Sequence, residues 1–447
     1  MGSRFGSRFA SLTAYADHMR SAASSIRNPA PLAWAFYDFA YSLYSFILLV
    51  RFFPTWIIND HDRPDWYVSL TQVTVVLFLL LAMPLTGALA DQHGRRKPFL
   101  IGFTVVSAVA CTGLGFVPID GNVLPALVVA GVAAAFGQLA FAQYDPLLAD
   151  VAPEGQRGRV SGIAVALGFA GIIFGLVVVA ELIVGDGSKQ RAFAPAGLLY
   201  IALALPALVL VRERPRVAAP AGGPLVGRAF GQLAQSVRQA RRYPRVSRFL
   251  AGRLLYSDAI ATLSAFLAVY MDRLGGFSET EKNLAFGLSV LAAAVGAVLG
   301  GRLVEQVGPK RPLLAVLPAF AACVLLSALV GRPWTVWVAA PIAGGALGVV
   351  WTADRVFMLR LTPPELRGQF FAFFNLANRV ASAIGPLLIW SGTVAILYQW
   401  TGWMSVLDAS RVALAGLGAA AILGWIVIRP LSDEHGEEEV AVAAALV

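Results

Sequence analysis

The chain contains twelve apolar stretches that are long enough to cross a lipid bilayer as helices, with short charged or Gly- and Pro-containing segments between them. Crossing the hydrocarbon core takes about 20 apolar residues in a helix. Of the 447 residues, 58% are hydrophobic and only 14% are charged, whereas roughly a quarter of the residues in soluble proteins are charged. The sequence therefore predicts an all-α membrane protein with twelve transmembrane helices and disfavours a soluble enzyme. We place the spans near residues 31–57, 66–90, 99–118, 123–149, 159–185, 193–211, 247–272, 282–303, 313–331, 334–360, 368–394 and 408–429.

The positive charges predict how the spans are oriented, because Lys and Arg gather in cytoplasmic loops. An even number of spans puts both termini on one side of the membrane. Of the 35 Lys and Arg residues, 24 lie in the terminal segments and loops of that side, and 6 lie in the loops of the other side. Both termini are therefore expected in the cytoplasm, with the chain in the inner (cytoplasmic) membrane of the cell. The net charge of +9 then reflects this orientation, and no nucleic-acid partner is predicted.

The longest predicted loop, residues 212–246, divides the chain into six spans and six spans. It begins with RERPRVAAPAGGP, a composition typical of a flexible boundary. Its second part could form an amphipathic helix on an anionic membrane surface or an ordinary solvated linker helix. We expect an N-terminal bundle over 31–211 and a C-terminal bundle over 247–429, with cytoplasmic segments at 1–30 and 430–447.

Two loops repeat each other, which indicates an internal duplication. GALADQHGRRKP (87–98) follows the second span, and GRLVEQVGPKRP (301–312) follows the eighth span 214 residues later. Both contain glycine, an acid, glycine, a basic pair and proline at the same spacing. The sequence therefore predicts two pseudo-symmetric six-helix bundles. The repeated positions are Gly87 and Gly301, Asp91 and Glu305, and Gly94 and Gly308.

Physical chemistry suggests a role for several residues of the first repeated loop. Gly87 lacks a side chain where spans must approach closely, and Gly94 allows a sharp turn that a Cβ would resist. Arg95 and Arg96 would hold this turn at the cytoplasmic headgroups. Asp91 needs a partner, and the positive N-terminal end of a neighbouring helix would provide one.

Two six-span halves with repeated loops resemble the major facilitator superfamily, and GALADQHGRRKP looks like the signature loop of that superfamily. The resemblance implies that Asp91 contacts the start of the eleventh span near Gly368 and latches the cytoplasmic side of an outward-facing state. It implies the same role for Glu305 against the fifth span near Gly158. A charged turn that only fixes the topology is the alternative.

Four further segments are similar to the "unknown major facilitator" branch, which is related to fungal autophagy-related vacuolar effluxers. The chain differs from the usual pattern of that branch at Tyr41, Ser257, Ala259 and Trp351, so its specificity is expected to differ. The fungal relatives are associated with efflux of amino acids such as leucine. The segments are WAFYDFAYSLYSFILLVRFFP (34–54), YDPLLADVAPEGQRGRVSGIAVALGFAG (144–171), FLAGRLLYSDAIAT (249–262) and GGALGVVWTADRVFMLRLTPPELRGQFFAFFNLANRVASAIGPL (344–387).

Eight of the ionisable residues within the predicted spans are candidates for function, because an ionisable side chain at the centre of a spanning helix costs about 2.5–3.5 kcal/mol. By resemblance, the first, fourth, seventh and tenth spans line the central cavity of the superfamily. Six of the eight residues fall on those spans, which favours a hydrated pathway. The eight are Asp38, Asp145, Glu181, Arg253, Asp258, Asp354, Arg355 and Arg379.

Depth along the spans suggests which of these charges meet, since a helix rises 1.5 Å per residue. Asp258 and Arg379 are predicted to lie level near the midplane. Asp38 and Arg253 are predicted to lie level with each other on different halves. A carboxyl group whose arginine partner moves away can take up a proton, so such pairs would couple protons to the rocking of the halves.

We therefore expect Asp38 and Asp258 to be the leading coupling or substrate-binding acids, with Arg355 and Arg379 as anion or charge-pair partners. Static salt bridges that hold the helices in register are the alternative. The predicted substrate and proton-coupling residues are Asp38, Arg253, Asp258, Asp354, Arg355 and Arg379.

Other residues near the embedded charges have less specific predictions. Arg51 and Glu181 lie near the outer ends of their spans and would suit an external gate. Asp145 precedes Pro146 and would suit a structural cap.

Among the many aromatic residues, Tyr37, Tyr41 and Trp351 neighbour the embedded charges and are predicted to line the cavity. Such walls suit a cation or an apolar substrate. Packing between helices is the alternative for each of them.

The function predicted from these patterns is secondary active transport of a small solute by alternating access. The expected solute is an amino acid or related zwitterion. Protons are a hypothetical coupling partner, and the protein is expected to be embedded in the lipid bilayer. A lipid or lysolipid flippase on the same fold is one alternative, and a non-transporting receptor or assembly factor is another. No ATP-binding loop or hydrolase motif is recognisable, so neither an enzyme nor a cofactor is predicted. Cys111 and Cys323 lie in apolar runs, so no metal site is predicted.

Overall fold

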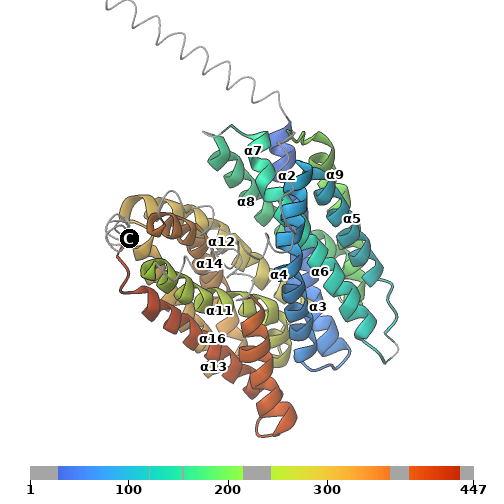
Figure 1. The fold of residues 1–447 in the computed structure, drawn as a ribbon. Coiled ribbons are helices and arrows are strands. Elements are labelled where there is room, and N and C mark those ends of the chain that lie inside the picture. Colours follow the sequence, from blue (N-terminus) through green and yellow to red (C-terminus); the bar gives the residue numbers. More distant parts are fainter. Residues whose placement is uncertain (1–28, 120, 154–155, 215–242, 363–381, 433–447) are drawn as a thin grey trace, which may run out of the picture.

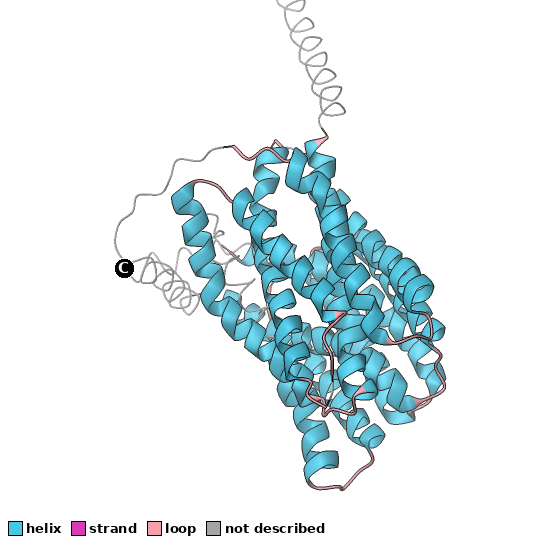
Figure 2. Cartoon of the chain, turned by 90° about the vertical axis from the view of Figure 1, so that its right-hand side faces the viewer, coloured by secondary structure: helices cyan, strands magenta, loops and turns pink. Residues whose placement is uncertain are grey.

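The computed structural model describes residues 29–432, except 120, 154–155, 215–242 and 363–381. In these ranges the regular secondary structure is helical, and 12 helical segments are long and apolar enough to cross a membrane (Figures 1 and 2). The predicted all-α fold with twelve transmembrane helices is confirmed. The chain is therefore a multi-pass membrane protein.

The first six spans build the N-terminal bundle, and the first of them changes helix type around Pro54. Proline has no main-chain N–H to donate, and π-helical turns flank it in a helix that continues to Asp60. The elements are α2 (Ala30–Ser45), η1 (Phe46–Phe52), α3 (Phe53–Thr55), η2 (Trp56–Asp60), α4 (Trp66–His93), α5 (Lys97–Leu114), α6 (Leu124–Tyr144), η3 (Asp145–Leu147), α7 (Leu148–Val151), α8 (Arg157–Phe174), η5 (Gly175–Val184), η6 (Lys189–Ala192) and α9 (Phe193–Leu210).

The last six spans build the C-terminal bundle, and its eleventh span is also π-helical. The described part of this span runs from Ser382 to Trp400, so the predicted end at residue 394 is too early. Two π-helical segments that begin at Gly385 and Ala395 carry the helix further. The elements are α11 (Pro244–Leu274), α12 (Glu279–Val307), α13 (Lys310–Val330), α14 (Pro333–Leu361), η8 (Gly385–Gly392), η9 (Ala395–Trp400) and α16 (Val406–Ile428).

The two bundles repeat the same packing. In the N-terminal bundle α2 packs on α8 and α9, and α5 packs on α6 and α9. In the C-terminal bundle α11 packs correspondingly on η8 and α16, and α13 packs on α14 and α16. The glycines of the repeated turns also match, because Gly94 has φ 63° and Gly308 has φ 82°, a region that favours residues without a Cβ. The predicted pseudo-symmetry is therefore present in the described helices.

The ends of the helices define two sides of the molecule. The side where α2 begins at Ala30 and α16 ends at Ile428 is called the termini side. The side where α3 and η2 lead into the loop before α4 is called the opposite side. Figure 1 shows the two bundles next to each other, and they meet through contacts of α11 with η1 and α3, of α4 with η8, and of α12 with α8 and η5.

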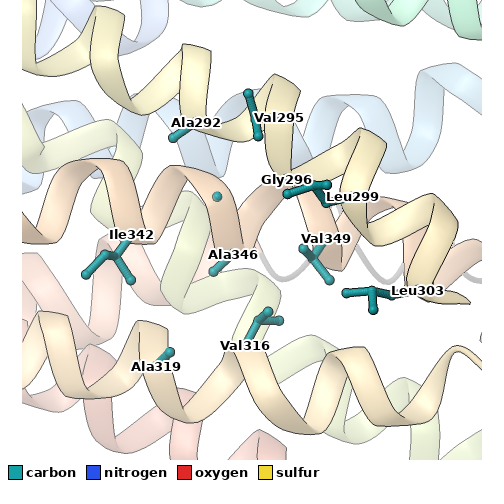
Figure 3. Close-up of a pocket in the computed structure, with 11 residues that line it drawn as sticks. Ala292, Val295, Gly296, Leu299, Leu303, Val316, Ala319, Ile342, Ala346 and Val349 are labelled. Carbon is teal, nitrogen blue, oxygen red and sulfur yellow. The ribbon is translucent and has the colours of Figure 1, made fainter. Parts of the chain in front are cut away.

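An apolar groove lies within the C-terminal bundle, between α12, α13 and α14 (Figure 3). Its lining residues are apolar, and Val295 and Leu299 are about half exposed. In a membrane protein such a surface faces lipid tails. The groove therefore suits an acyl chain and offers no polar group to a charged solute.

Candidate functional site

Two of the buried embedded charges form a pair within the C-terminal bundle. The Nε of Arg253 on α11 donates to Oδ2 of Asp354 on α14 at 2.8 Å, and the Tyr256 hydroxyl donates to Oδ1 at 2.6 Å. All three side chains are buried. This pair holds two helices of one bundle together.

The predicted pairing of Arg253 with Asp38 is therefore wrong. Asp38 instead accepts a hydrogen bond from Ser42. Equal depth along two spans does not fix the direction in which each side chain points around its helix, and this direction decides the partner.

Asp38 and Arg355 are brought together from different bundles. On α2, Oδ1 of Asp38 accepts a hydrogen bond from the Ser42 hydroxyl at 3.2 Å. Arg355 on α14 is exposed, and its charge attracts the Asp38 carboxylate. Asp145 on η3 lies close enough to repel the same carboxylate. Charges of opposite sign from the two bundles thus lie within electrostatic range of each other, without an ion pair between them.

Asp258 lies buried on α11 and faces the turn that begins the π-helical part of the eleventh span. Its Oδ1 accepts a hydrogen bond from the main-chain N–H of Gly385 at 2.8 Å. Its predicted partner Arg379 lies outside the described residues, so that pairing stays a prediction. One helical turn further along α11, Thr262 is buried and its hydroxyl oxygen has no hydrogen-bond partner in the described structure.

The three predicted cavity aromatics have different surroundings. Tyr37 is completely buried, and its hydroxyl shares hydrogen bonds with Thr104 at 2.8 Å and Tyr200 at 2.7 Å. It is therefore part of the core of the N-terminal bundle, and the prediction that it lines a cavity is wrong in this conformation. Tyr41 is partly buried and stacks on Phe141 with ring centroids 4.4 Å apart.

Trp351 has the most open surroundings of the three aromatics. Its side chain is 51% exposed. It stacks on Phe169 of α8 with ring centroids 6.2 Å apart. Because Trp351 belongs to α14, this contact joins the two bundles.

A first group of charged contacts joins the bundles on the opposite side. Arg51 of η1 is buried, pairs with Oε2 of Glu279 at 2.6 Å, and donates to Oδ1 of Asn283 at 2.7 Å. Asn283 in turn donates to Glu181 of η5 at 2.9 Å, and Thr280 donates to the same carboxylate at 2.7 Å. Arg51 and Glu181 therefore both lie in a polar contact between the bundles, and their assignment to an external gate stays a prediction.

A second group of contacts joins the bundles beside the first. Asp65, in the loop before α4, pairs with Arg273 at the end of α11. The indole N–H of Trp390 on η8 donates to Oδ2 of the same carboxylate at 2.7 Å. Ser69 on α4 contacts the Ser391 hydroxyl at 2.7 Å and donates to the Pro386 carbonyl at 2.8 Å. These two groups of contacts are called the opposite-side junction.

The partners in the opposite-side junction were missed in the sequence, although a signal is present. Loop 59–65 reads NDHDRPD, and segments 271–273 and 278–283 read MDR and SETEKN. Acidic and basic residues thus occur on both sides of the interface. The packing of helices from the two bundles decides which of these residues pair. The hydrophobic periodicity of the sequence does not reveal this packing.

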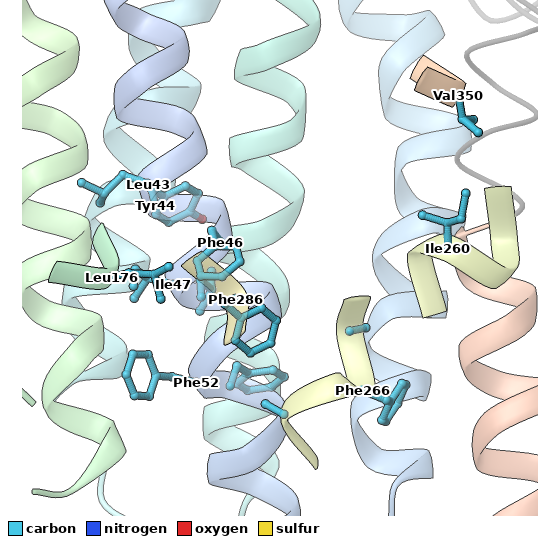
Figure 4. Close-up of a cluster of buried hydrophobic side chains, with 14 of the residues drawn as sticks. Leu43, Tyr44, Phe46, Ile47, Phe52, Leu176, Ile260, Phe266, Phe286 and Val350 are labelled. Atoms are coloured by element: carbon cyan, nitrogen blue, oxygen red, sulfur yellow. The ribbon is translucent and has the colours of Figure 1, made fainter. Parts of the chain in front are cut away.

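An apolar contact continues the junction toward the interior. Figure 4 shows Phe46 of η1 and Phe286 of α12 close together in a cluster of buried side chains. Their rings meet edge to face with centroids 5.4 Å apart. The opposite-side ends of the two bundles are therefore sealed by both ion pairs and aromatic packing.

Comparison with known proteins identifies the family. The profile of the Major Facilitator Superfamily matches residues 32–386. The chain belongs to the Major Facilitator Superfamily. Transport proteins of this superfamily carry solutes rather than catalyse reactions, so the chain is a transporter and not an enzyme.

Relatives within the superfamily come from bacteria and fungi. The chain is 26% identical over 407 residues to the uncharacterized MFS-type transporter YxiO of Bacillus subtilis, covering 86% of this chain and 92% of the relative. It is 26% identical over 269 residues to autophagy-related protein 22 of Yarrowia lipolytica, covering 52% of this chain and 45% of the relative. The multidrug resistance protein MdtG of Enterobacter lignolyticus is 21% identical over 354 residues, covering 77% of this chain and 81% of the relative. The predicted resemblance to this branch is confirmed.

Solved structures share the fold at low sequence identity. The nucleoside transporter NupG matches with a TM-score of 0.70 and 14% identity, over 90% of this chain and 98% of that one. A bacterial homologue of the human lysosomal transporter Spinster, in an inward-facing and unoccupied conformation, matches with a TM-score of 0.67 and 16% identity, over 90% of this chain and 97% of that one. These likenesses show the superfamily fold.

The signature loops of the superfamily lie on the termini side. Glu305 is exposed and makes no hydrogen bond or ion pair with the part of the chain that the structure describes. The predicted contact of Glu305 with the fifth span near Gly158 involves residues outside the described part of the chain, so it stays a prediction. The side chain of Asp91 and the segments near Gly158 and Gly368 lie outside the described residues, so the first latch stays a prediction.

The structure also corrects the expected close approach at the first glycine of the loop. No heavy atom of the described residues lies within 4 Å of a Cβ built on Gly87, and a Cβ on Gly301 would meet only Thr352, at 3.8 Å. Helices on this side are not tightly packed at these positions. The turn glycines Gly94 and Gly308, in contrast, have the positive φ that the predicted sharp turn requires.

Hydrogen bonds that the sequence analysis did not predict fix the first signature loop. Both oxygens of Glu213, just after α9, accept hydrogen bonds from the main-chain N–H groups of Arg96 and Lys97 at 2.5 and 2.9 Å. A carboxylate at the N-terminal end of α5 is favoured by the helix dipole. The Lys97 ammonium group donates to the Val211 carbonyl at 2.6 Å. The loop is thereby tied to the end of the sixth span, where the linker begins.

Proposed function

We propose that the chain is a secondary active transporter that moves a small zwitterion, such as an amino acid, by alternating access. The arrangement that carries this proposal is Asp38 on α2 of one bundle and the exposed Arg355 on α14 of the other, whose charges lie within electrostatic range without forming an ion pair. A carboxylate on one bundle and a guanidinium on the other can bind the ammonium and carboxylate groups of one solute. Binding of such a solute would link the two bundles.

The opposite-side junction supports alternating access. Its ion pairs and aromatic contacts hold the bundles together on one side of the candidate solute site. Rocking of two six-helix halves around a midplane site is how superfamily-type repeats change access. In our proposal the junction faces the outside and both termini lie in the cytoplasm of a cell with this protein in its inner membrane, as the Lys and Arg distribution favours.

Proton coupling is the second part of the proposal. Asp38 forms no direct ion pair with a described residue and accepts one hydrogen bond, from Ser42. A carboxyl group in this setting can exchange a proton during the cycle. Asp354 is held by Arg253 and Tyr256, and we assign this group a structural role.

Export of an amphipathic cation is the second candidate function. The exposed ring of Trp351 beside Phe169 offers an aromatic surface at the interface of the bundles. A cation can bind to such a ring, and Asp38 supplies a nearby negative charge. The relatives named multidrug resistance protein favour this class of substrate.

A binding screen on the purified full-length protein distinguishes the two candidates. Ligands that bind the folded state raise its unfolding temperature, and we would screen amino acids, peptides, lysolipids and hydrophobic cations at two pH values. Zwitterion transport predicts stabilisation by amino acids that is lost in both Asp38→Asn and Arg355→Gln. Cation export predicts stabilisation by hydrophobic cations that is lost in Asp38→Asn and Trp351→Ala but kept in Arg355→Gln.

The control for this screen is Lys189→Ala. Lys189 pairs with Asp60 within the N-terminal bundle, at 2.5 Å. Unaltered stabilisation by amino acids in both Asp38→Asn and Arg355→Gln would refute the proposed solute site.

A further inference from the structure

Asp258, the acidic residue on the seventh span, does not belong to the proposed solute site and has a different chemical environment. Asp258 is buried inside the bundle, and no cationic side chain of the described residues contacts it. Its one hydrogen bond comes from a neutral main-chain N–H group. A carboxylate inside the membrane is costly unless a positive charge compensates it.

A second oxygen points to the same place. Thr262 is 0% exposed, and its hydroxyl oxygen has no hydrogen-bond partner among the described residues. A Cβ built on Gly385 would lie 2.6 and 2.5 Å from the two carboxylate oxygens of Asp258, and it would also clash with the Thr262 hydroxyl. Three side-chain oxygens from one face of α11 therefore converge on the main chain of Gly385.

The main chain at this point is irregular. Gly385 and Pro386 begin the π-helical segment η8. Single π-helical turns inside helices are frequent at functional sites. Irregular main chain in transporter helices supplies carbonyl oxygens to sodium ions.

We propose that Asp258, Thr262 and the Gly385–Pro386 turn form a binding site for a sodium ion. A single carboxylate balances one positive charge, so a monovalent ion leaves the site neutral, whereas a divalent ion would not. The bound ion would tie α11 to the eleventh span. This inference rests on the proposed transport function for its role, because sodium would then be a coupling ion.

A related set of residues in the N-terminal bundle sharpens the assignment. Asp38 and Ser42 on α2 face Gly168 on α8, as Asp258 and Thr262 face Gly385. In the N-terminal set the hydroxyl of Ser42 already donates to the carboxylate at 3.2 Å, and Arg355 supplies a positive charge nearby. We therefore assign sodium to the C-terminal set and solute to the N-terminal set.

The test measures thermal unfolding of the purified full-length protein in sodium, potassium or choline chloride at equal ionic strength. A site for sodium predicts an unfolding temperature that is a few degrees higher in sodium than in choline, with a smaller effect of potassium. Thr262→Val keeps the shape but removes the hydroxyl, so it should fold normally in choline and lose most of the sodium effect. Asp258→Asn should lose all of it.

Ser264→Ala is the matched control, because its hydroxyl lies on the same helix but donates to the Ile260 carbonyl at 2.9 Å. This variant should keep the full sodium effect. Equal unfolding temperatures in the three salts, or a sodium effect that survives in Thr262→Val, would overturn the site. A stabilisation that follows pH and ignores sodium would also overturn it and assign the carboxyl to a proton.

The outcome can be separated from that of the proposed solute site. Sodium binding is measured without any solute, whereas the solute screen relies on Asp38 and Arg355. A sodium effect without stabilisation by any solute would refute the solute proposal alone. Solute binding without a sodium effect would refute the sodium site alone.

Discussion

On the opposite side of the molecule, Arg51 and Arg273 of different bundles are paired with acids across the interface. On the termini side, Glu305 of the second signature loop has no partner in the described residues. Both sides carry charged residues at the ends of spans. The difference is that each ion pair of the opposite-side junction has one buried member, Arg51 or Asp65, whereas Glu305 is exposed.

In the proposed alternating-access cycle, this difference would allow the two sides to open in turn. A buried ion pair is costly to break, because it leaves an unpaired charge. An exposed acid can remain solvated until its partner helix approaches. In this conformation the ion pairs of the opposite-side junction are formed. When that junction opens, the predicted latch of the superfamily would instead form contacts of the charged signature loops on the termini side.

The largest effect is expected when the first group of the junction loses its buried arginine. Arg51→Ala removes the ion pair with Glu279 and the hydrogen bond to Asn283. Truncating one partner of a buried charge pair costs about 2–5 kcal/mol, so molecules with an open junction should become at least about tenfold more frequent. Double electron–electron resonance between labels at Asp62→Cys and Trp403→Cys, with Cys111 and Cys323 replaced by alanine, would show a larger long-distance population.

The control for this measurement is Lys189→Ala. The ion pair of Lys189 with Asp60 lies on the same side but within one bundle, so the distance distribution should not change. An unaltered distribution in Arg51→Ala would show that the junction does not hold this conformation.

A smaller change in the same direction is expected for Trp390→Phe. Phenylalanine keeps the ring that stacks on Phe266 but cannot donate to Asp65. Losing a hydrogen bond to a charged group costs about 1.5–3 kcal/mol, and Arg273 still pairs with Asp65. The same labels should show a shift that is smaller than that of Arg51→Ala.

Trp425→Phe provides the matched comparison. It also loses an indole N–H, but that group donates to the Leu314 carbonyl within the C-terminal bundle. If both tryptophan variants shift the distances equally, the effect of Trp390→Phe comes from general destabilisation and not from the junction.

The smallest effects are expected on the termini side. Glu213→Gln removes a charge from the N-terminal end of α5 and should cost about 0.3–1 kcal/mol of stability. Glu305→Gln should leave the unfolding temperature of this conformation unchanged, because Glu305 is exposed and has no partner among the described residues. Thermal unfolding of both variants measures the difference, and a larger loss in Glu305→Gln than in Glu213→Gln would contradict the contrast between the two sides.

Part of the site could be predicted from local patterns. Arg51 and Glu181 were assigned to an external gate because they are charges near the outer ends of apolar spans, and the structure places both in the opposite-side junction. Tyr37 was assigned to a cavity because it precedes Asp38, but adjacent residues on a helix point about 100° apart. Its hydroxyl is satisfied by Thr104 and Tyr200 inside the bundle.

The sequence alone determined the number of spans, the duplication of the halves and the family of the chain, because each depends on properties that repeat along the chain. Apolar length decides whether a helix can cross a bilayer, and the loops at Gly94 and Gly308 repeat turn chemistry that requires glycine. Only the tertiary structure decided that Arg253 pairs with Asp354, that Arg355 lies within electrostatic range of Asp38, and that Thr262 and Asp258 converge on Gly385. The physical reason is that a partner is chosen by the rotation and packing of helices that are distant in the chain, and each apolar span can rotate without changing its hydrophobicity.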